Sequence, residues 1–158
     1  MEEQIKTTYY KAWTDLIEEE LNDNKFDIVC KLHREIVIRI CRCIPSRSDL
    51  HDQIAEKMDP VLFRQQLENK VYTGEEFLNM IQYVYTWIKN LSSPARDKDI
   101  ENSLNELLKH MNDGVTFGKL VPEFVLKVHQ HLDDLETDLG RDVTKKFKEF
   151  VKEKLNTQ

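Results

Sequence analysis

The stretch TGEEFLNMIQYVYTWIKNL, Thr73 to Leu91, decides the fold, because its apolar residues recur at the spacing of a helix face. Thr73 and Glu76 form the pattern of a capping box, which marks the first turn of a helix. The main apolar stripe is Phe77, Met80, Ile81, Val84, Ile88 and Leu91, widened by Leu78, Tyr85 and Trp87. A helix with apolar residues around so much of its circumference is typical of the centre of a bundle.

A second central helix is predicted over residues 26–44. Its apolar and sulfur-containing residues are Val29, Leu32, Ile36, Val37, Ile40, Cys41 and Ile44. Pro45 ends it, because proline cannot continue the hydrogen-bond ladder of a helix. We expect the segments 26–44 and 73–91 to form the centre of the fold.

The remaining segments also have helical spacing, with breaks at turn residues. Short helices are predicted after Ser48 or Asp49 and after the pair Asp59–Pro60, and another helix opens at Pro94. Beyond Pro122 the apolar series runs to Gly140 and then resumes, so 122–155 is either one helix or two. The sequence therefore predicts an all-α, single-domain bundle of six to eight helices over residues 1–158.

Composition and charge restrict the class of protein. The chain has 158 residues, 33% charged and 40% hydrophobic, which suits one soluble helical domain. No apolar run approaches the roughly 20 residues of a membrane span, and the N-terminus lacks the features of a signal peptide. We therefore expect a cytoplasmic location. The net charge of −6 argues against nucleic acid as a partner.

Two basic regions stand out against this acidic background. One surrounds the helix predicted at 26–44 and offers a possible partner surface of Arg34, Arg39, Arg42 and Arg47. The other is the C-terminal segment, where Phe147 and Phe150 alternate with Lys145, Lys146, Lys148 and Lys152. A basic amphipathic helix of this kind binds a membrane surface or a partner groove, although packing of its aromatic face on the bundle is the interpretation we favour.

No catalytic or metal-binding constellation can be read from the chain. The acidic clusters EEEL, GEEF and LDDLE lie on predicted polar faces, and His33, His51 and His110 are isolated in sequence. Cys30, Cys41 and Cys43 lack the spacing of a zinc site and are expected to be reduced thiols. We expect no enzyme activity, no cofactor and no metal.

Several short segments, in order along the chain, resemble the T-complex protein 11 family over about residues 32–111. They are LHREI at 32–36, IPSR at 44–47, MDPVLFRQQLENK at 58–70, WIKNL at 87–91 and LSSPARDKDI at 91–100. Members of the family commonly have a cysteine where this chain has Ser92, whereas Pro94, Arg96 and Asp97 agree with the family pattern. The chain resembles a compact, single-domain member with a divergent helical tail at 112–158.

The resemblance implies an all-helical, non-enzymatic protein, in a family associated with cyclic AMP and protein kinase A signalling and, in animals, with sperm function. We therefore expect an adaptor or regulatory domain that binds a signalling protein. The alternative is a membrane-surface or self-associating protein that uses the C-terminal helix. The oligomeric state is left open.

Arg96 raises a separate question, because a cation near the start of a helix opposes the positive end of the helix dipole. If the side chain turns inward, it can pair with Glu35 or Glu68 and clamp two helices together. If it turns outward, Arg96 and Asp97 form a docking point for an acidic or phosphorylated partner. We favour the clamp. The full set of candidate clamp or partner-binding residues is Arg96, Asp97, Glu35, Glu68, Gln65 and Gln66.

Overall fold

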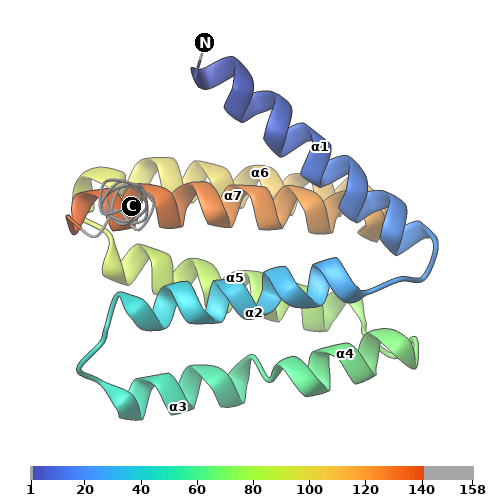
Figure 1. The fold of residues 1–158 in the computed structure, drawn as a ribbon, viewed down its shortest axis with the longest axis horizontal. Coiled ribbons are helices and arrows are strands. Elements are labelled where there is room, and N and C mark those ends of the chain that lie inside the picture. Colours follow the sequence, from blue (N-terminus) through green and yellow to red (C-terminus); the bar gives the residue numbers. More distant parts are fainter. Residues whose placement is uncertain (1, 141–158) are drawn as a thin grey trace, which may run out of the picture.

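The computed structural model describes residues 2–140, apart from the side chains of residues 2, 3, 6 and 7. Within this range the chain is an all-α bundle of seven α-helices and one short 3₁₀-helix, and it contains no strand (Figure 1). The elements are α1 (Glu2–Asn22), α2 (Asp27–Arg42), α3 (Ser48–Lys57), α4 (Pro60–Glu68), α5 (Gly74–Leu91), η1 (Pro94–Arg96), α6 (Asp97–Asn112) and α7 (Phe117–Asp138). The predicted all-α bundle is confirmed.

Two of the predicted helix starts have the expected caps. The Asp59 carboxylate accepts hydrogen bonds from the backbone N–H groups of Val61 and Leu62 at 2.9 and 3.3 Å, and Pro60 follows as the first helical residue. The Thr73 hydroxyl accepts the N–H of Glu76 at 3.2 Å. These bonds satisfy donors that have no partner within the helix, and each cap contributes about 1 kcal/mol to stability.

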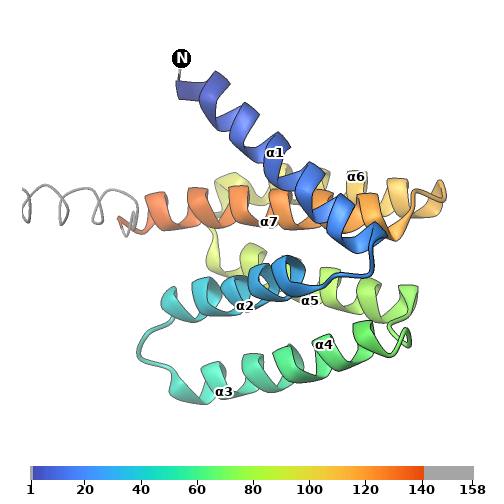
Figure 2. The ribbon, with the colours of Figure 1, turned by 45° about the vertical axis from the view of Figure 1, so that its right-hand side comes forward.

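The helices are arranged in layers. Figures 1 and 2 show α6 and α7 on one side, α2 and α5 in the middle, and the α3–α4 pair on the other side. Helix α7 contacts α1, α2, α5 and α6. Helix α1 crosses α7 and its N-terminal half extends away from the bundle.

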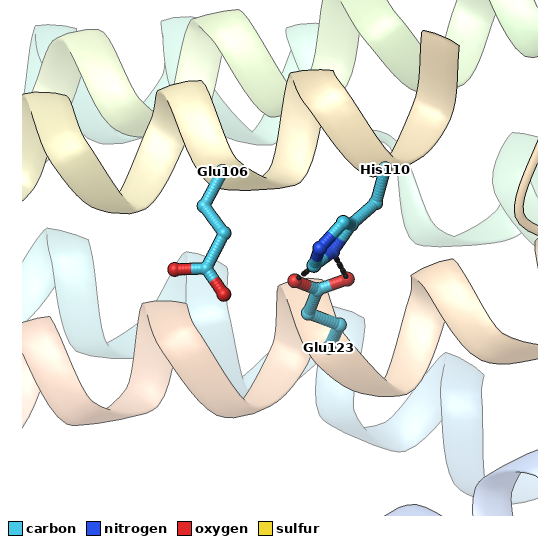
Figure 3. A group of neighbouring side chains, drawn as sticks. All are labelled: Glu106, His110 and Glu123. Carbon is cyan, nitrogen blue, oxygen red and sulfur yellow. Dashed lines mark hydrogen bonds and ion pairs between the residues drawn. The ribbon is translucent and has the colours of Figure 1, made fainter. Parts of the chain in front are cut away.

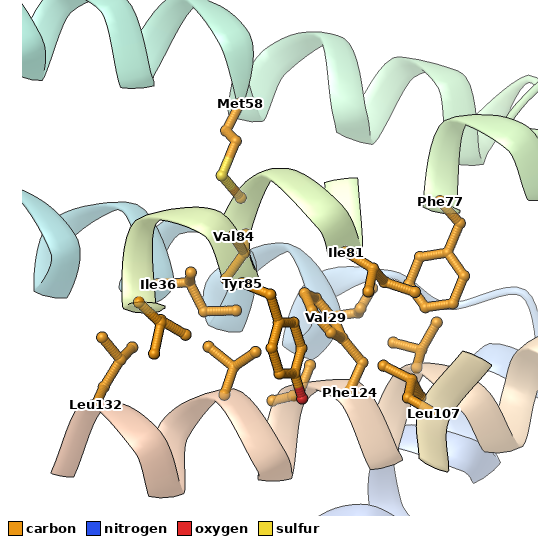
Figure 4. Packing of buried hydrophobic residues seen from close by; sticks show 14 of the residues in the cluster. Val29, Ile36, Met58, Phe77, Ile81, Val84, Tyr85, Leu107, Phe124 and Leu132 are labelled. Atoms are coloured by element: carbon orange, nitrogen blue, oxygen red, sulfur yellow. The ribbon is translucent and has the colours of Figure 1, made fainter. Parts of the chain in front are cut away.

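The hydrophobic core fills the space between α2, α5, α6 and α7 and continues to buried residues of α1, α3 and α4 (Figure 4). Each fully buried side chain of this kind contributes about 1.5–3 kcal/mol. Helix α5 buries five residues and α7 buries nine, whereas α2 buries four. The segments 26–44 and 73–91 do line the core, but α7 contributes more buried side chains to it than either.

A glycine lies near each end of α7. The helix begins at Phe117, upstream of Pro122, so the proline lies inside it. Gly118, four residues before Pro122, lies against the end of α1, where an added Cβ would be only 2.9 Å from the Asn22 side-chain oxygen. After Asp138 the chain leaves the helix through Gly140, whose φ of +68° is the left-handed conformation of a C-terminal cap. Whether 122–155 holds one helix or two is not decided, because residues 141–158 lie outside the described residues.

None of the helices in the described part of the chain is both long and apolar enough to cross a bilayer.

Candidate functional site

A groove of about 430 Å³ lies between α1, α2 and α7. Its walls are mostly apolar or aromatic and come from all three helices: Tyr9, Trp13, Ile17, Leu32, Val125 and Leu126. One end of the groove is polar and contains Arg39 of α2 with His129 and Asp133 of α7. The groove therefore combines a largely apolar lining with a fixed group of charges at one end, and the exposed Lys31 and Glu35 of α2 also line it.

The groove exists because α1 packs on α7 along only part of its length. Ile17 and Leu21 are buried against the bundle, and the next residue, Asn22, lies against Gly118. Towards the N-terminus α1 diverges from α7, which leaves Ile5 68% and Tyr9 57% exposed. Tyr9 makes an edge-to-face contact with Trp13 at 5.9 Å between ring centroids. The apolar stripe of α1 is thus only partly covered by the bundle.

Arg39 forms the polar end of the groove by binding three groups on α7. Its guanidinium donates to Glu136 at 3.0 Å, to Asp133 at 2.6 Å and to the Nδ1 atom of His129 at 2.8 Å. The Arg39 side chain is only 15% exposed and that of Glu136 only 11%. Burial opposes the charge on Arg39, but the hydrogen bonds to Glu136 and Asp133 outweigh it and raise the pKa of the guanidinium. Arg39 therefore clamps α2 to α7.

Tyr10 adds α1 to this network. Its hydroxyl donates to the other carboxylate oxygen of Asp133 at 3.2 Å. Burial, together with the nearby Asp133 charge, raises the pKa of Tyr10 to about 12, so the phenol stays protonated and keeps donating. Asp133 thus connects α1, α2 and α7 at one point.

His129 is neutral in this network. Burial, and then the adjacent Arg39 charge, lower the pKa of His129 to about 4. Since Nδ1 accepts a hydrogen bond from Arg39, the proton of the neutral ring is on Nε2. That Nε2 atom is buried and has no hydrogen-bond partner among the described residues. An uncharged imidazole here avoids repulsion against the arginine.

One of the four arginines predicted to form a partner surface, Arg39, is largely buried, so that part of the prediction is wrong. Arg39 turns inward to α7, because it lies on the same face of α2 as Leu32 and Glu35, which line the groove. Arg34 and Arg42 are exposed, and Arg47 forms an ion pair with Asp49 at 2.9 Å across the surface. Within the described residues the basic segment therefore supplies one interhelical clamp and three exposed arginines.

The partners expected for Arg96 are also wrong. Arg96 donates to both oxygens of Asp138 at 3.1 Å and lies 3.7 Å from Asp134, so it joins the start of α6 to the end of α7. Glu68 binds Arg64 at 2.9 Å instead, and Glu35 lines the groove. The Arg96 side chain is 37% exposed. The bidentate geometry matches the expectation, but the pair is not buried.

The local fold explains why a cation is tolerated at Arg96. Residues Pro94–Arg96 form a 3₁₀ turn, and α6 begins only at Asp97, which is half-buried in its first turn. The last turn of α7 contains no basic residue of its own. Arg96 therefore places a positive charge near the negative end of the α7 dipole, where a cation is favourable.

The two glutamines do not join this clamp. Gln65 is exposed on α4 and lines a surface hollow with Arg34 and Glu68. Gln66 is half-buried and lines a cavity with His33, on another side of α2 from the groove. The six candidate residues thus lie in several places, so they do not form one site.

His110, which is isolated in sequence, lies beside two carboxylates in the structure. Its Nδ1 atom lies 2.7 and 3.0 Å from the two oxygens of Glu123, and Glu106 lies beside them (Figure 3). A metal ion could use these three side chains as ligands. However, the ammonium group of Lys127 lies 3.3 Å from Glu106 and 3.9 Å from Glu123, so a cation already balances the carboxylates.

Two further predictions concern the cysteines and the C-terminal segment. None of the three cysteines forms a disulfide in the part of the chain that the structure describes. The predicted membrane or partner helix, with Phe147, Phe150 and the lysines at 145, 146, 148 and 152, lies outside the described residues.

The fold and the groove define a class of protein: an all-α bundle whose first helix leaves an open, largely apolar groove. The chain belongs to the T-complex protein 11 family, whose model matches residues 1–139. The match extends beyond 32–111 at both ends, so it includes α1 and α7, the two helices that bound the groove with α2. No solved structure matches the chain.

Proposed function

We propose that this protein is a non-enzymatic helical adaptor or regulatory domain that binds an amphipathic helix of a signalling protein. The observation that carries the proposal is the apolar groove between α1, α2 and α7, together with the uncovered stripe on α1. Helix-in-groove binding uses such a surface, because apolar residues at helical spacing fill it one turn at a time.

The residues lining the groove suit protein binding. Tyr9, Tyr10 and Trp13 lie along one wall, and large aromatic residues supply much of the energy in protein interfaces. At the polar end, Arg39, Asp133 and Tyr10 already satisfy one another. A partner helix that covers these three residues therefore gains apolar contact without breaking the clamp, and the exposed Lys31 and Glu35 of the groove can pair with its polar face.

Membership of the T-complex protein 11 family supports a place in cyclic AMP and protein kinase A signalling in the cytoplasm. The regulatory and catalytic subunits of protein kinase A are therefore the first partners to test. The experiment is a direct binding measurement between each purified subunit and the full chain by isothermal titration calorimetry.

A matched pair of variants locates the contact. Leu126→Glu places a charge in the groove, whereas Ile38→Glu places the same charge on an exposed apolar position of α2 that lines neither the groove nor another cavity. We expect a subunit to bind the wild type and the Ile38→Glu chain and to bind Leu126→Glu at least about tenfold more weakly. If a subunit binds both variants equally, and circular dichroism shows that both are folded, the groove is not the binding site. If neither subunit binds the wild-type chain, the proposed role in protein kinase A signalling is wrong.

A second candidate is a membrane-surface or self-associating protein, favoured by the alternation of lysines with aromatics after residue 140. Flotation with anionic liposomes, and sedimentation velocity without lipid, compare the full chain with one lacking residues 141–158. Loss of flotation or of a dimer on deletion would support this candidate. A monomer that never floats would exclude it.

A further inference from the structure

A second cavity, of about 270 Å³, lies on another side of α2, where α2, α4 and α5 meet. Two of the segments that resemble the family converge here: LHREI contributes His33, and MDPVLFRQQLENK contributes Asp59, Phe63 and Gln66. His33 is only 4% exposed, and its Nδ1 atom has no hydrogen-bond partner among the described residues. A buried polar atom without a partner is costly, so packing alone does not explain this histidine.

Aromatic rings form the walls of this cavity. The imidazole of His33 stacks on Phe63 with ring centroids 4.2 Å apart and planes 10° from parallel. Tyr72 meets Phe63 edge-on at 5.2 Å. Burial lowers the pKa of His33 to about 4, so the ring is neutral at pH 7 and does not repel a cation. Because His33 and Phe63 are almost fully buried and cover each other, a flat group entering the cavity meets mainly the half-buried rings of Tyr72 and Tyr83.

The charges at the cavity are predominantly negative. Asp59 and Glu76 are both half-buried, and neither carboxylate has an ion-pair partner among the described residues. One oxygen of Asp59 caps α4, which leaves the other available. The exposed Lys57 is the one basic side chain lining the cavity, and its ammonium group lies 6.0 Å from the centre of the Tyr83 ring. Two carboxylates and one exposed ammonium group thus line the cavity.

We propose that this cavity binds an arginine side chain of a partner protein. A guanidinium group is planar, stacks on aromatic faces and pairs with carboxylates through two parallel hydrogen bonds, so it suits both the walls and the charges. An anion would meet Asp59 and Glu76 and be repelled. An uncharged molecule would leave both carboxylates unpaired. The proposal is independent of the groove, since the two sites lie on different sides of α2.

The test follows the methionine methyl groups of the full chain by NMR. The chain has four methionines, of which Met58 and Met80 line the cavity and Met111 does not. The probe is N-acetyl-L-arginine amide, and the matched control is N-acetyl-L-citrulline amide, which has nearly the same shape without the charge. We expect saturable shifts at Met58 and Met80 with the arginine probe, little change at Met111, and no saturation with citrulline.

Two variants assign the contact. Glu75 and Glu76 both lie in the first turn of α5, but only Glu76 lines the cavity, so Glu75→Gln controls for the helix dipole. Glu76→Gln should weaken binding of the arginine probe about threefold or more, and Glu75→Gln should leave it unchanged. The proposal is overturned if the methyl groups show no saturable shift, if citrulline binds as well as arginine, or if Glu76→Gln binds as the wild type does.

Discussion

Arg39 and Arg96 both attach α7 to another helix, and they differ mainly in exposure to solvent. Arg39 is 15% exposed and binds Glu136, which is 11% exposed, together with Asp133. Arg96 is 37% exposed and binds Asp138, which is 33% exposed. Each guanidinium forms at least two hydrogen bonds to carboxylates. The same kind of arginine–carboxylate pair therefore occurs twice in the molecule, once largely buried and once partly exposed.

The comparison teaches that geometry alone does not set the energy of an ion pair. Water screens an exposed pair and hydrates either partner when the other is removed, so such a pair contributes little. In a buried pair, removal of one partner leaves the other charge without water or counterion, and the cost is large. Arg39 should therefore stabilise the bundle far more than Arg96.

The largest expected effect is that of Arg39→Ala. The substitution leaves Glu136 and part of Asp133 uncompensated between α2 and α7, which should lower the free energy of unfolding by about 3 kcal/mol. Thermal unfolding followed by circular dichroism should show a loss of about 10 °C in Tm. The control is Arg34→Ala, an exposed arginine on the same helix, which should remain within about 2 °C of the wild type. Equal effects of the two substitutions would contradict the clamp.

Low pH should destabilise the fold, because His129, next to Arg39, resists protonation in the folded chain. The folded pKa of about 4 lies below the ordinary value of 6.5, because burial and Arg39 disfavour the imidazolium. Below pH 6.5 the unfolded chain takes up a proton that the folded chain does not, so this contribution to stability is lost between pH 6.5 and 4. The loss attributable to His129 should reach about 2 kcal/mol at pH 4.5.

The measurement is the free energy of unfolding by urea at pH 7 and at pH 4.5. His129→Gln should lower the dependence on pH, whereas the Arg96→Ala chain should follow the wild-type curve. The His129→Gln chain should retain part of the pH dependence of stability, because burial also lowers the pKa of His33 to about 4. A pH dependence that His129→Gln leaves intact would exclude His129 as its source.

Arg39→Lys should have a smaller effect than Arg39→Ala. Lysine keeps the positive charge, but its ammonium group cannot reach Glu136, Asp133 and His129 with the flat, forked geometry of a guanidinium. The expected loss is about 1 kcal/mol, measured by the same urea titration. A lysine variant as unstable as the alanine variant would show that the fork matters more than the charge.

The sequence predicted the helices better than their arrangement. Helical spacing, Pro60 and the caps at Asp59 and Thr73 are local features, so they could be read directly. The contribution of α7 to the core could not, because apolar spacing shows which face is buried and says nothing of how many neighbours cover it. Pro122 also suggested a later start than the observed Phe117.

The site was predicted less well, for a related reason. Local sequence marked Arg96 as unusual, since it follows a proline near a helix start, whereas Arg39 looked like one of several arginines on a polar face. The partners of both are on α7, and pairing across the bundle depends on the packing of helices far apart in sequence. The repeated carboxylates of LDDLETD were the available signal, because Asp134 and Asp138 are four residues apart and share a helix face.

The smallest expected effect is that of Arg96→Ala, and it completes the comparison. In the wild type this pair has two hydrogen bonds of 3.1 Å. Because water reaches both Arg96 and Asp138, losing the pair should still change Tm by no more than about 2 °C. Asp138→Asn and the double variant complete a cycle that isolates the pair from other effects of each substitution. High salt should shrink the coupling further, since exposed pairs are screened. A coupling as large as that between Arg39 and Glu136 would mean that the forked geometry governs these clamps, and that burial is secondary.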